Sequence, residues 1–429
     1  MSEKSPVFAL RDREYLQSFE KKSLARYACL SESAADLRAR SQASHPYRTE
    51  FQRDRDRIIH SRAFRRLKHK RQVFHTNVGD HYRTRLTHTM EVTQIARTMA
   101  RALGLNEDLT EAVALGHDLG HTPFGHLGEY LLDEIMQGKH GNLDGLPSKR
   151  CGGFKHNYQS VRILDLLEKK YRTPGLNLTA PVREGVIKHT RLKKKRIHYA
   201  DLDLRGLHWE FETPTTLEGQ IVAIADEIAQ RTHDLEDGVR AGLVEMQEVR
   251  KLEIVQLAER KFRFEFDSTD DAYFYQNRLT SSMINLLVDD VIETAFEGID
   301  AFYQEKQRLT FFDRLIVDFS PELDPLQKAL NKFIYQNIIY RPMVNNADDL
   351  LRGVLLMLFQ AFALNPELLP NPSKSDPDGK EFQATPRLIC DHIAGMTDFF
   401  ALSAYKKFRK KGVIQSNIDL SDFEAQWMR

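Results

Sequence analysis

Cysteine is scarce in this chain, and the few cysteines are scattered. Cys29, Cys151 and Cys390 are widely spaced, and no two of them form a Cys-x-x-Cys pair. This distribution argues against a disulfide framework and against a thiolate zinc site. It is typical of a protein from a reducing compartment, so we expect a cytoplasmic location.

Long apolar runs and an excess of one charge are also missing. No segment approaches the roughly 18 apolar residues that a membrane-spanning helix needs, and residues 1–6 carry no apolar signal region. The formal net charge is +1, so the molecule as a whole has no strong attraction for polyanions and any basic site must be local. We therefore expect no membrane partner.

Alternation of apolar and polar residues, which is typical of strands, is scarce as well. The best strand candidate is a short run in which Phe262, Phe264 and Phe266 alternate with charged residues. Apolar residues three or four apart are far more frequent, and this spacing predicts helices. The predicted helices cover residues 88–99, 106–117, 217–228, 286–302 and 352–364. The sequence therefore predicts an all-α fold.

Glycine and proline indicate where some of these elements begin and end. Gly104 is expected to end the first predicted helix. Thr122 and Pro123 are expected to cap and begin another helix that runs through Ile135. The predicted loops are the glycine-rich segment 138–153 and the proline-rich segment 366–380.

One short segment, residues 116–129, concentrates ionisable side chains. His117 and Asp118 are adjacent, and His121, His126 and Glu129 follow closely. Each of these groups must be paired if it is buried, and together they are typical ligands of a divalent metal. A lone histidine would more simply be a core or surface residue, but the cluster favours a metal site.

Two more residues complete a plausible set of metal ligands. His88 precedes His117 by 29 residues, and Asp226 follows Asp118 by 108 residues. Ligands on separate helices meet in the core of a helical bundle, so the long gap is no obstacle. Two imidazoles and two carboxylates suit Mn²⁺, Fe²⁺ or Zn²⁺, and Mg²⁺ less well. Such an ion can lower the pKa of bound water and polarise a phosphoryl group.

This pattern of His, His-Asp and Asp in a helical chain resembles the HD-domain phosphohydrolase superfamily. The resemblance narrows to the deoxyguanosine triphosphate triphosphohydrolase family on residues 55–67, 80–89, 116–129, 152–157, 225–229 and 391–398. It implies an HD-domain helical bundle with an additional helical C-terminal region. It also implies an N-terminal extension over 1–50, a catalytic domain over 51–240, and a region over 241–429 that completes the substrate pocket and the oligomer contacts.

Members of that family cleave a dNTP between the 5′ oxygen and the α-phosphorus, and they release a deoxynucleoside and inorganic triphosphate. The resemblance implies that His126 and Glu129 are the catalytic pair, with His121 between this pair and the metal. The leaving 5′ oxygen needs a proton, which a positioned imidazolium can deliver. We hypothesise that water activated at the cation attacks the α-phosphorus while His126 protonates the leaving oxygen; His126 as base or nucleophile is the alternative. The implied metal ligands are His88, His117, Asp118 and Asp226.

The resemblance also implies contacts to the phosphates. Arg85 lies one helical turn before His88 and would hold the α-phosphate, since a guanidinium suits phosphate oxygens. His156 would be a further phosphate contact. Arg83, in contrast, is expected to be a solvated arginine.

Contacts to the sugar are implied on one face of a helix. Asp226, Gln230 and Asp234 are spaced by four residues, so a continuous helix would turn all three toward the site. Asp234 and Gln72 would contact the 3′-hydroxyl. At the position of Gln230 the family usually has a tyrosine that excludes a 2′-hydroxyl, so the exclusion of ribonucleotides is in doubt here.

Two stretches, residues 62–71 and 188–198, are dense in basic side chains. Each is either a solvated face or an anion site for an effector nucleotide, the distal phosphates of the substrate, or single-stranded DNA. Family members are often homo-oligomers, and some are switched by dNTPs bound between subunits. The resemblance therefore implies a tetramer or hexamer, and residues 193–196 would suit an effector dNTP.

Two rival functions share part of this pattern. Another HD-domain nucleotide phosphohydrolase, acting on a 5′-nucleotide, a cyclic nucleotide or (p)ppGpp, would keep the metal ligands but not the segment 121–129. A non-catalytic protein could use the fold to bind nucleotide or nucleic acid. The complete ligand set and the intact pair of His126 and Glu129 argue against this second rival.

Overall fold

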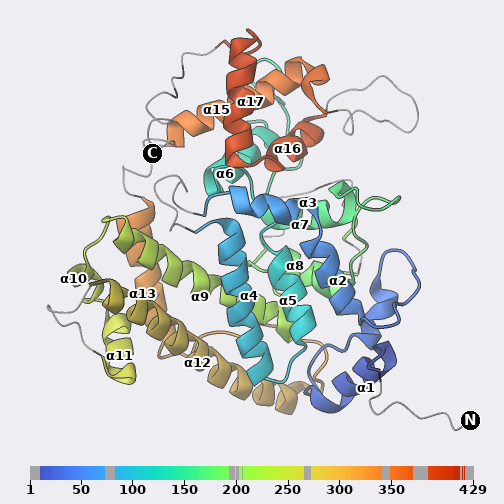
Figure 1. Cartoon of the computed structure of the whole chain (residues 1–429), viewed down its shortest axis with the longest axis vertical. Helices are drawn as coiled ribbons and strands as arrows, with labels where there is room; N and C mark the ends of the chain where they lie inside the picture. The colour runs from blue at the N-terminus through green and yellow to red at the C-terminus, as the bar shows by residue number, and fades with distance from the viewer. Residues whose placement is uncertain are drawn as a thin grey trace, which may run out of the picture.

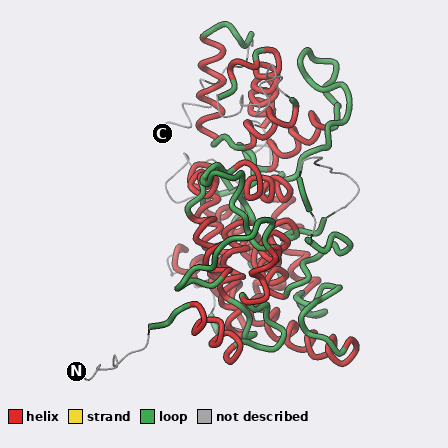
Figure 2. The backbone as a smooth tube through the Cα atoms, turned by 90° about the vertical axis from the view of Figure 1, so that its right-hand side faces the viewer, coloured by secondary structure: helices red, strands yellow, loops and turns green. Residues whose placement is uncertain are grey.

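A computed structural model describes residues 10–72, 83–192, 199, 202–204, 206–264, 272–340, 348–370, 385–415, 418 and 420. Over these residues the fold is all-α, as predicted, and β-structure is limited to two isolated bridges (Figures 1 and 2). The α-helices are α1 (Arg13–Ser23), α2 (Glu50–Ile59), α3 (Arg62–Arg66), α4 (Arg85–Ala102), α5 (Glu107–Gly116), α6 (His126–Met136), α7 (His156–Arg162), α8 (Ala180–Ile187), α9 (Leu217–Arg240), α10 (Met246–Val249), α11 (Glu253–Phe262), α12 (Ala272–Lys306), α13 (Asp324–Ile334), α15 (Asp348–Leu364), α16 (Pro386–Ala394) and α17 (Asp398–Lys410). Among the described helices, none combines the length and the apolar character that crossing a membrane requires.

Helices α4, α5 and α9 form the centre of the molecule, and each begins at a side-chain cap. Thr84 and Thr87 form a reciprocal capping box at α4, Asn106 caps α5, and Thr216 caps α9. The helix α4 ends before Gly104, whose φ of +66° places it in the left-handed region, as the sequence predicted. The apolar stripes of the three helices face one another in the core.

The apolar core consists of two separate clusters. The main cluster contains residues from 28 to 338 and surrounds α4, α5 and α9. The C-terminal cluster joins α15, α16 and α17 to α6 and to the loop that follows it. Figure 1 shows the C-terminal helices stacked above the rest, with α6 between them and one end of α4. The two clusters therefore meet at α6, which precedes α15 by more than two hundred residues.

Two local predictions were wrong. Phe262 is the last residue of α11 rather than part of a strand, and Phe264 is buried against the main cluster; Phe266 lies outside the described residues. The helix expected from Thr122 begins at His126 instead, because residues 122–125 form a turn in which the Thr122 hydroxyl donates to the Gly125 carbonyl at 2.8 Å.

The predicted loops are partly within the described residues. Residues 138–153 contain only turns and irregular backbone, so this loop prediction is confirmed. In the proline-rich segment, Pro366–Leu368 form a short 3₁₀ turn, and residues 371–380 lie outside the described residues.

Candidate metal centre and active site

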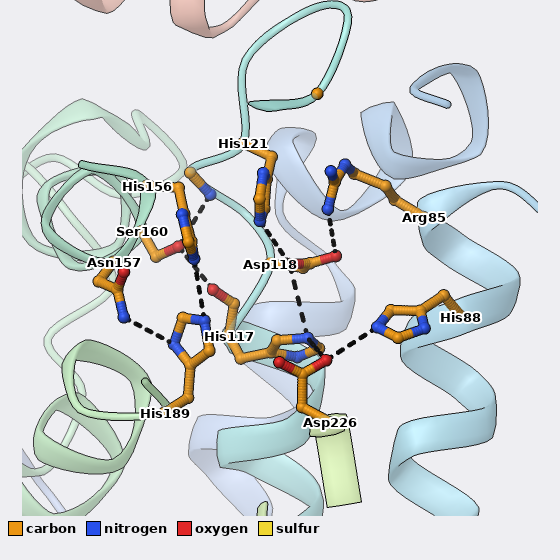
Figure 3. A network of polar contacts seen from close by, with 12 residues as sticks. Arg85, His88, His117, Asp118, His121, His156, Asn157, Ser160, His189 and Asp226 are labelled. Atoms are coloured by element: carbon orange, nitrogen blue, oxygen red, sulfur yellow. Dashed lines mark hydrogen bonds and ion pairs between the residues drawn. The ribbon is translucent and has the colours of Figure 1, made fainter. Parts of the chain in front are cut away.

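Four side chains predicted as metal ligands converge between α4, α5 and α9 (Figure 3). His88 lies on α4, His117 and Asp118 directly follow α5, and Asp226 lies on α9. His88 Nε2 is 2.9 Å from Asp226 Oδ1. His117 Nε2 is 3.5 Å from Asp118 Oδ1 and 3.6 Å from Asp226 Oδ1. Residues separated by up to 138 positions in the chain thus share one small polar cluster.

The hydrogen bonds of His117 indicate that this cluster fits a divalent cation. Its Nδ1 lies 2.6 Å from the carbonyl oxygen of Ala114, so Nδ1–H donates there and Nε2 is the nitrogen that faces the two carboxylates. Nε2 is fully buried and has no hydrogen-bond partner among the described residues. A lone pair that faces the oxygens of Asp118 and Asp226 is repelled by them unless a cation or a proton lies between.

The charges around the cluster set the protonation of its members. Burial lowers the pKa of His117, but the Asp118 and Asp226 carboxylates outweigh burial and raise it to about 9. Burial raises the pKa of Asp226, but His117 and His88 outweigh it and hold the carboxyl well below its usual range. Burial also raises the pKa of Asp118, but His121 and Arg85 outweigh it and hold that pKa well below its usual range, so both carboxylates are ionised and available to a metal.

Arg85 and His121 border the cluster on the side of Asp118. Arg85 Nη1 donates to Asp118 Oδ2 at 2.9 Å, and its Nε is buried without a hydrogen-bond partner in the described part of the chain. His121 Nε2 lies 2.9 Å from Asp118 Oδ1, and its Nδ1 is similarly unpartnered. Arg85 and His121 therefore flank Asp118, and each keeps one buried nitrogen without a partner among the described residues.

A second group of ionisable side chains lies beside the first, on α6 and α7. His126 Nδ1 is 3.2 Å from Glu129 Oε2, so the predicted pair does share one face of α6. His156 Nδ1 lies 3.0 Å from each oxygen of Glu129, and its ring stacks on His121 with centroids 3.9 Å apart. Lys155 Nζ is 3.1 Å from Glu129 Oε1. One carboxylate therefore holds three basic side chains.

The carboxylate of Glu129 is buried, whereas the ring of its partner His126 reaches solvent. Burial raises the pKa of Glu129, but His156 and His126 outweigh burial and hold it well below its usual range. The side chain of His126 is 53% exposed, and that of Glu129 is 6% exposed. His126 is thus anchored at Nδ1 by an ionised carboxylate while its remaining edge is accessible.

The residues predicted to contact the sugar are brought near the site. The helix α9 is continuous from Asp226 through Gln230 to Asp234, as the spacing predicted. Burial, with Asp237 and Asp226, raises the pKa of Asp234 to about 8. Gln72 lies beside the turn before α6, because its carbonyl oxygen would be 3.6 Å from a β-carbon on Gly125.

The expectation for Arg83 was wrong, and one residue of the second basic stretch is not part of a solvated face. Arg83 is not solvated: it forms ion pairs with Glu91, Glu236 and Asp237 at 2.8–3.0 Å. Lys188, in the second basic stretch, is buried and pairs with Glu184 at 2.7 Å. The part of that stretch expected to suit an effector, residues 193–196, lies outside the described residues.

Several residues around the site were not singled out from the sequence. His189 Nε2 is 3.1 Å from His156 Nε2, and His233 Nδ1 is 3.4 Å from His88 Nδ1. Lys70 and Asp398 contact the turn before α6. Asp398 belongs to the segment 391–398 that carries the family resemblance, and Lys70 and His189 lie in the two basic stretches. Nothing in the sequence indicates that these residues meet at the site.

Comparisons with known proteins agree with this geometry. Residues 85–231 match the HD domain family, and residues 317–407 match the phosphohydrolase-associated domain family. A deoxyguanosinetriphosphate triphosphohydrolase-like protein of Azoarcus sp. (strain BH72) is 39% identical over 394 residues, which cover 91% of this chain and 98% of the relative. One of the same name from Ralstonia pickettii (strain 12J) is 40% identical over 389 residues, which cover 90% and 94%.

The chain belongs to the family of deoxyguanosinetriphosphate triphosphohydrolase-like proteins. The prediction from the motifs is therefore confirmed at the level of the family, and the protein is an HD-domain phosphohydrolase. The HD match runs from Arg85 to Arg231, so it contains all four predicted metal ligands and the pair of His126 and Glu129.

Proposed function

We propose that the protein hydrolyses a deoxynucleoside triphosphate to a deoxynucleoside and inorganic triphosphate. One observation carries this proposal: His121 connects the buried metal cluster to the anchored but accessible His126. Its Nε2 is 2.9 Å from Asp118 Oδ1, and its ring centroid is 5.7 Å from that of His126. A metal cluster alone would suit any HD-domain phosphohydrolase. An acid held beside it supplies what an alkoxide leaving group requires.

The ligands of the cation would be His88, His117, Asp118 and Asp226, a mixed nitrogen and oxygen set that suits Mn²⁺, Fe²⁺ or Zn²⁺, with Mg²⁺ less favoured. When bound, such a cation polarises the α-phosphoryl group and lowers the pKa of water. The guanidinium of Arg85, adjacent to Asp118, binds an oxygen of the α-phosphate. His156 would be a further contact to the phosphates, and the ring of His121 stacks on it and lies against Asp118.

The proton for the leaving group comes from His126. Nδ1–H donates to Glu129, so Nε2–H is the proton that faces the substrate. As water oxygen bonds to the α-phosphorus, the bond to O5′ breaks and O5′ takes the proton from Nε2. The imidazole then accepts the proton that the attacking water loses, and the charge balance is restored. Glu129 holds the orientation of the ring through Nδ1. A positioned acid of this kind contributes on the order of 10²–10⁴ in rate.

The sugar would lie along α9. With a pKa near 8, Asp234 is mostly protonated at pH 7 and donates its proton to the 3′-hydroxyl or accepts from it. Gln230 is polar and flexible, so it offers a hydrogen bond where an aromatic ring would exclude a 2′-hydroxyl. We therefore expect GTP to be hydrolysed along with dGTP.

The test is an analysis of products with the four dNTPs and GTP, singly and in mixtures, with Mg²⁺, Mn²⁺ and Fe²⁺. Release of triphosphate supports the proposal. Monophosphate with pyrophosphate would favour another type of HD-domain nucleotide phosphohydrolase, and no product would favour a binding protein. In the same assay, His126→Ala should lose turnover while its metal content stays at the wild-type level. Loss of the metal would instead mean that His126 has a structural role.

Partners beyond the substrate remain part of this proposal. Mixtures in which one dNTP accelerates hydrolysis of another would support an effector site, whereas strictly additive rates would contradict it. A homo-oligomer and binding of single-stranded DNA are expected from the family resemblance alone.

A further inference from the structure

Three segments that are far apart in the sequence meet beside the candidate site. They are residues 70–71 after α3, the turn 121–125 before α6, and residues 394–398 between α16 and α17. The buried ammonium of Lys70 donates to the carbonyl oxygens of both His121 and Ala394, the latter at 2.9 Å. This junction therefore ties the active-site turn to the C-terminal helices, and it includes part of the 391–398 motif for which the proposed reaction assigns no role.

One carboxylate, that of Asp398 at the start of α17, is central to this junction. Its Oδ1 accepts the backbone N–H of Phe124 at 2.9 Å, and its Oδ2 accepts the backbone N–H of Arg71 at 3.0 Å. Arg71 Nη2 in turn donates to the carbonyl oxygen of Phe124 at 3.2 Å, so the contacts close into a ring. Asp398 is 5% exposed, so its carboxylate is largely shielded from water.

The turn that Asp398 holds has a strained backbone. Phe124 and Gly125 have φ values of +62° and +63°, so two successive residues lie in the left-handed region, and the first of them is not glycine. Such conformations persist only where the surroundings enforce them. The helix α6 begins at the very next residue, His126, so the direction of the His126 side chain depends on this turn.

The two halves of the candidate site are anchored in different hydrophobic clusters. His88, His117 and Asp226 belong to helices of the main cluster. The helix α6, which carries His126, packs into the C-terminal cluster, and so does the buried ring of Phe124. The distance between His126 and the predicted metal ligands therefore depends on how the C-terminal hydrophobic cluster is positioned against the main hydrophobic cluster.

We propose that Asp398 is a positioning residue that fixes the C-terminal hydrophobic cluster relative to the main one. It also holds the turn 122–125, so that His126 faces the phosphate bound at the metal cluster. The inference rests on the proposed function, since it assumes that His126 acts on a substrate. Small displacements of a reacting group are costly: an error of about 1 Å can reduce the rate about 100-fold. Asp398 acts through the backbone and does not touch the substrate.

The test compares Asp398→Ala with Glu218→Ala. Glu218 is a matched control, because it is also buried and its Oε1 accepts two backbone N–H groups, those of Cys29 at 2.8 Å and Asn106 at 3.1 Å, away from the turn. Both variants should lose stability. Only Asp398→Ala should lower kcat, by about 10- to 100-fold, and the metal content should stay unchanged, because the predicted metal ligands lie on or beside helices of the main cluster.

A fall in kcat that is equal in the two variants, or a rise in KM with kcat unchanged, would overturn the proposal. Asp398→Asn, which keeps one acceptor oxygen, replaces the alanine variant if that variant does not fold, and the same criteria apply. Hydrogen exchange gives a readout without substrate: residues 121–127 should exchange faster in the Asp398 variants than in the wild type. If the wild-type protein releases no triphosphate from any dNTP, the proposed function has failed, and unchanged exchange in 121–127 would then overturn the role of Asp398 on its own.

Discussion

At the scale of single residues, His117 shows how the fold prepares a ligand before any metal is bound. The carbonyl oxygen of Ala114 fixes the tautomer through Nδ1, and Asp118 and Asp226 surround Nε2. Without a cation the carboxylates retain a proton on the ring, which is why its pKa rises to about 9 despite burial. A metal must displace that proton, so metal binding releases protons and is weaker at low pH.

Asp234 gives a prediction at the same scale, because its pKa rises from 3.8 in the unfolded chain to about 8 in the fold. Between these values the folded protein holds a proton that the unfolded chain has lost. Its contribution to stability is therefore complete below about pH 4 and is lost as the pH rises to about 8, at up to about 1.4 kcal/mol per pH unit. Replacing Asp234 by Asn should remove this loss, so the stability of the variant relative to wild type should increase from pH 5 to pH 8.

Urea denaturation in the presence of a chelator would measure this difference, since the chelator keeps the nearby metal cluster empty. Asp289→Asn, at a position with 48% side-chain exposure, is the control for the loss of a surface carboxylate. If the difference in stability between wild type and Asp234→Asn is the same at pH 5 and pH 8, the carboxyl is not protonated in the folded protein.

At the scale of elements, the helices that carry the metal ligands follow from local sequence. The stripe through His88, the cap Asn106 and the four-residue spacing from Asp226 to Asp234 each predict a feature that the structure contains. The start of α6 could not be predicted in the same way. Thr122-Pro123 is a typical helix start, but the contact of Phe124 with Asp398, 274 residues later, favours a turn there.

The turn after α5 gives the prediction at this scale, since it leaves no space for a side chain at Gly120. A β-carbon on Gly120 would lie 2.1 Å from the His156 carbonyl oxygen and 2.3 Å from the Ser160 backbone nitrogen. Ser160 also joins this turn to α7, because its hydroxyl donates to the His117 carbonyl oxygen at 2.8 Å. Gly120→Ala must push α7 away, and we expect a loss of about 3 kcal/mol in the free energy of unfolding.

The measurement is the urea midpoint of Gly120→Ala against that of Gly206→Ala. Gly206 has a φ of +78° and open space around its β-carbon position, so alanine there adds backbone strain without a clash. Equal midpoints for the two variants would mean that the backbone around Gly120 relaxes without cost. His156 moves with α7, so the Gly120 variant should also lose turnover.

At the scale of the whole molecule, the candidate site lies where the two hydrophobic clusters meet. The family resemblance implied that the C-terminal region completes the substrate pocket, but the sequence did not reveal which elements meet there. The four metal ligands can be found by spacing, but the partnership of α6 with α15 to α17 depends on contacts between residues more than two hundred positions apart. The division into domains at 50 and 240 stays a prediction, as does each role assigned to a single site residue.

The ion pair between Arg162 on α7 and Asp391 on α16 gives the last prediction, because it connects the two parts of the molecule in a dry environment. Nη2 and Nε of Arg162 donate to Asp391 at 2.8 and 2.9 Å, and both side chains are 6% exposed. Removing one partner of a buried pair leaves the other charge without its counterion, which typically costs about 3–5 kcal/mol. Asp391→Ala should therefore lower the free energy of unfolding by about that amount.

The double variant Arg162→Met/Asp391→Leu separates the charge from the packing. An apolar pair of similar volume is often as stable as a buried ion pair, so the double variant should recover most of the stability that Asp391→Ala loses. Urea denaturation of wild type, both single variants and the double variant completes a double-mutant cycle. If the losses of the two single variants simply add in the double variant, the two residues are not coupled. The attachment of the C-terminal helices would then not depend on an interaction between these two charges, and Asp398 and Lys70 would hold the active-site turn without help from this pair.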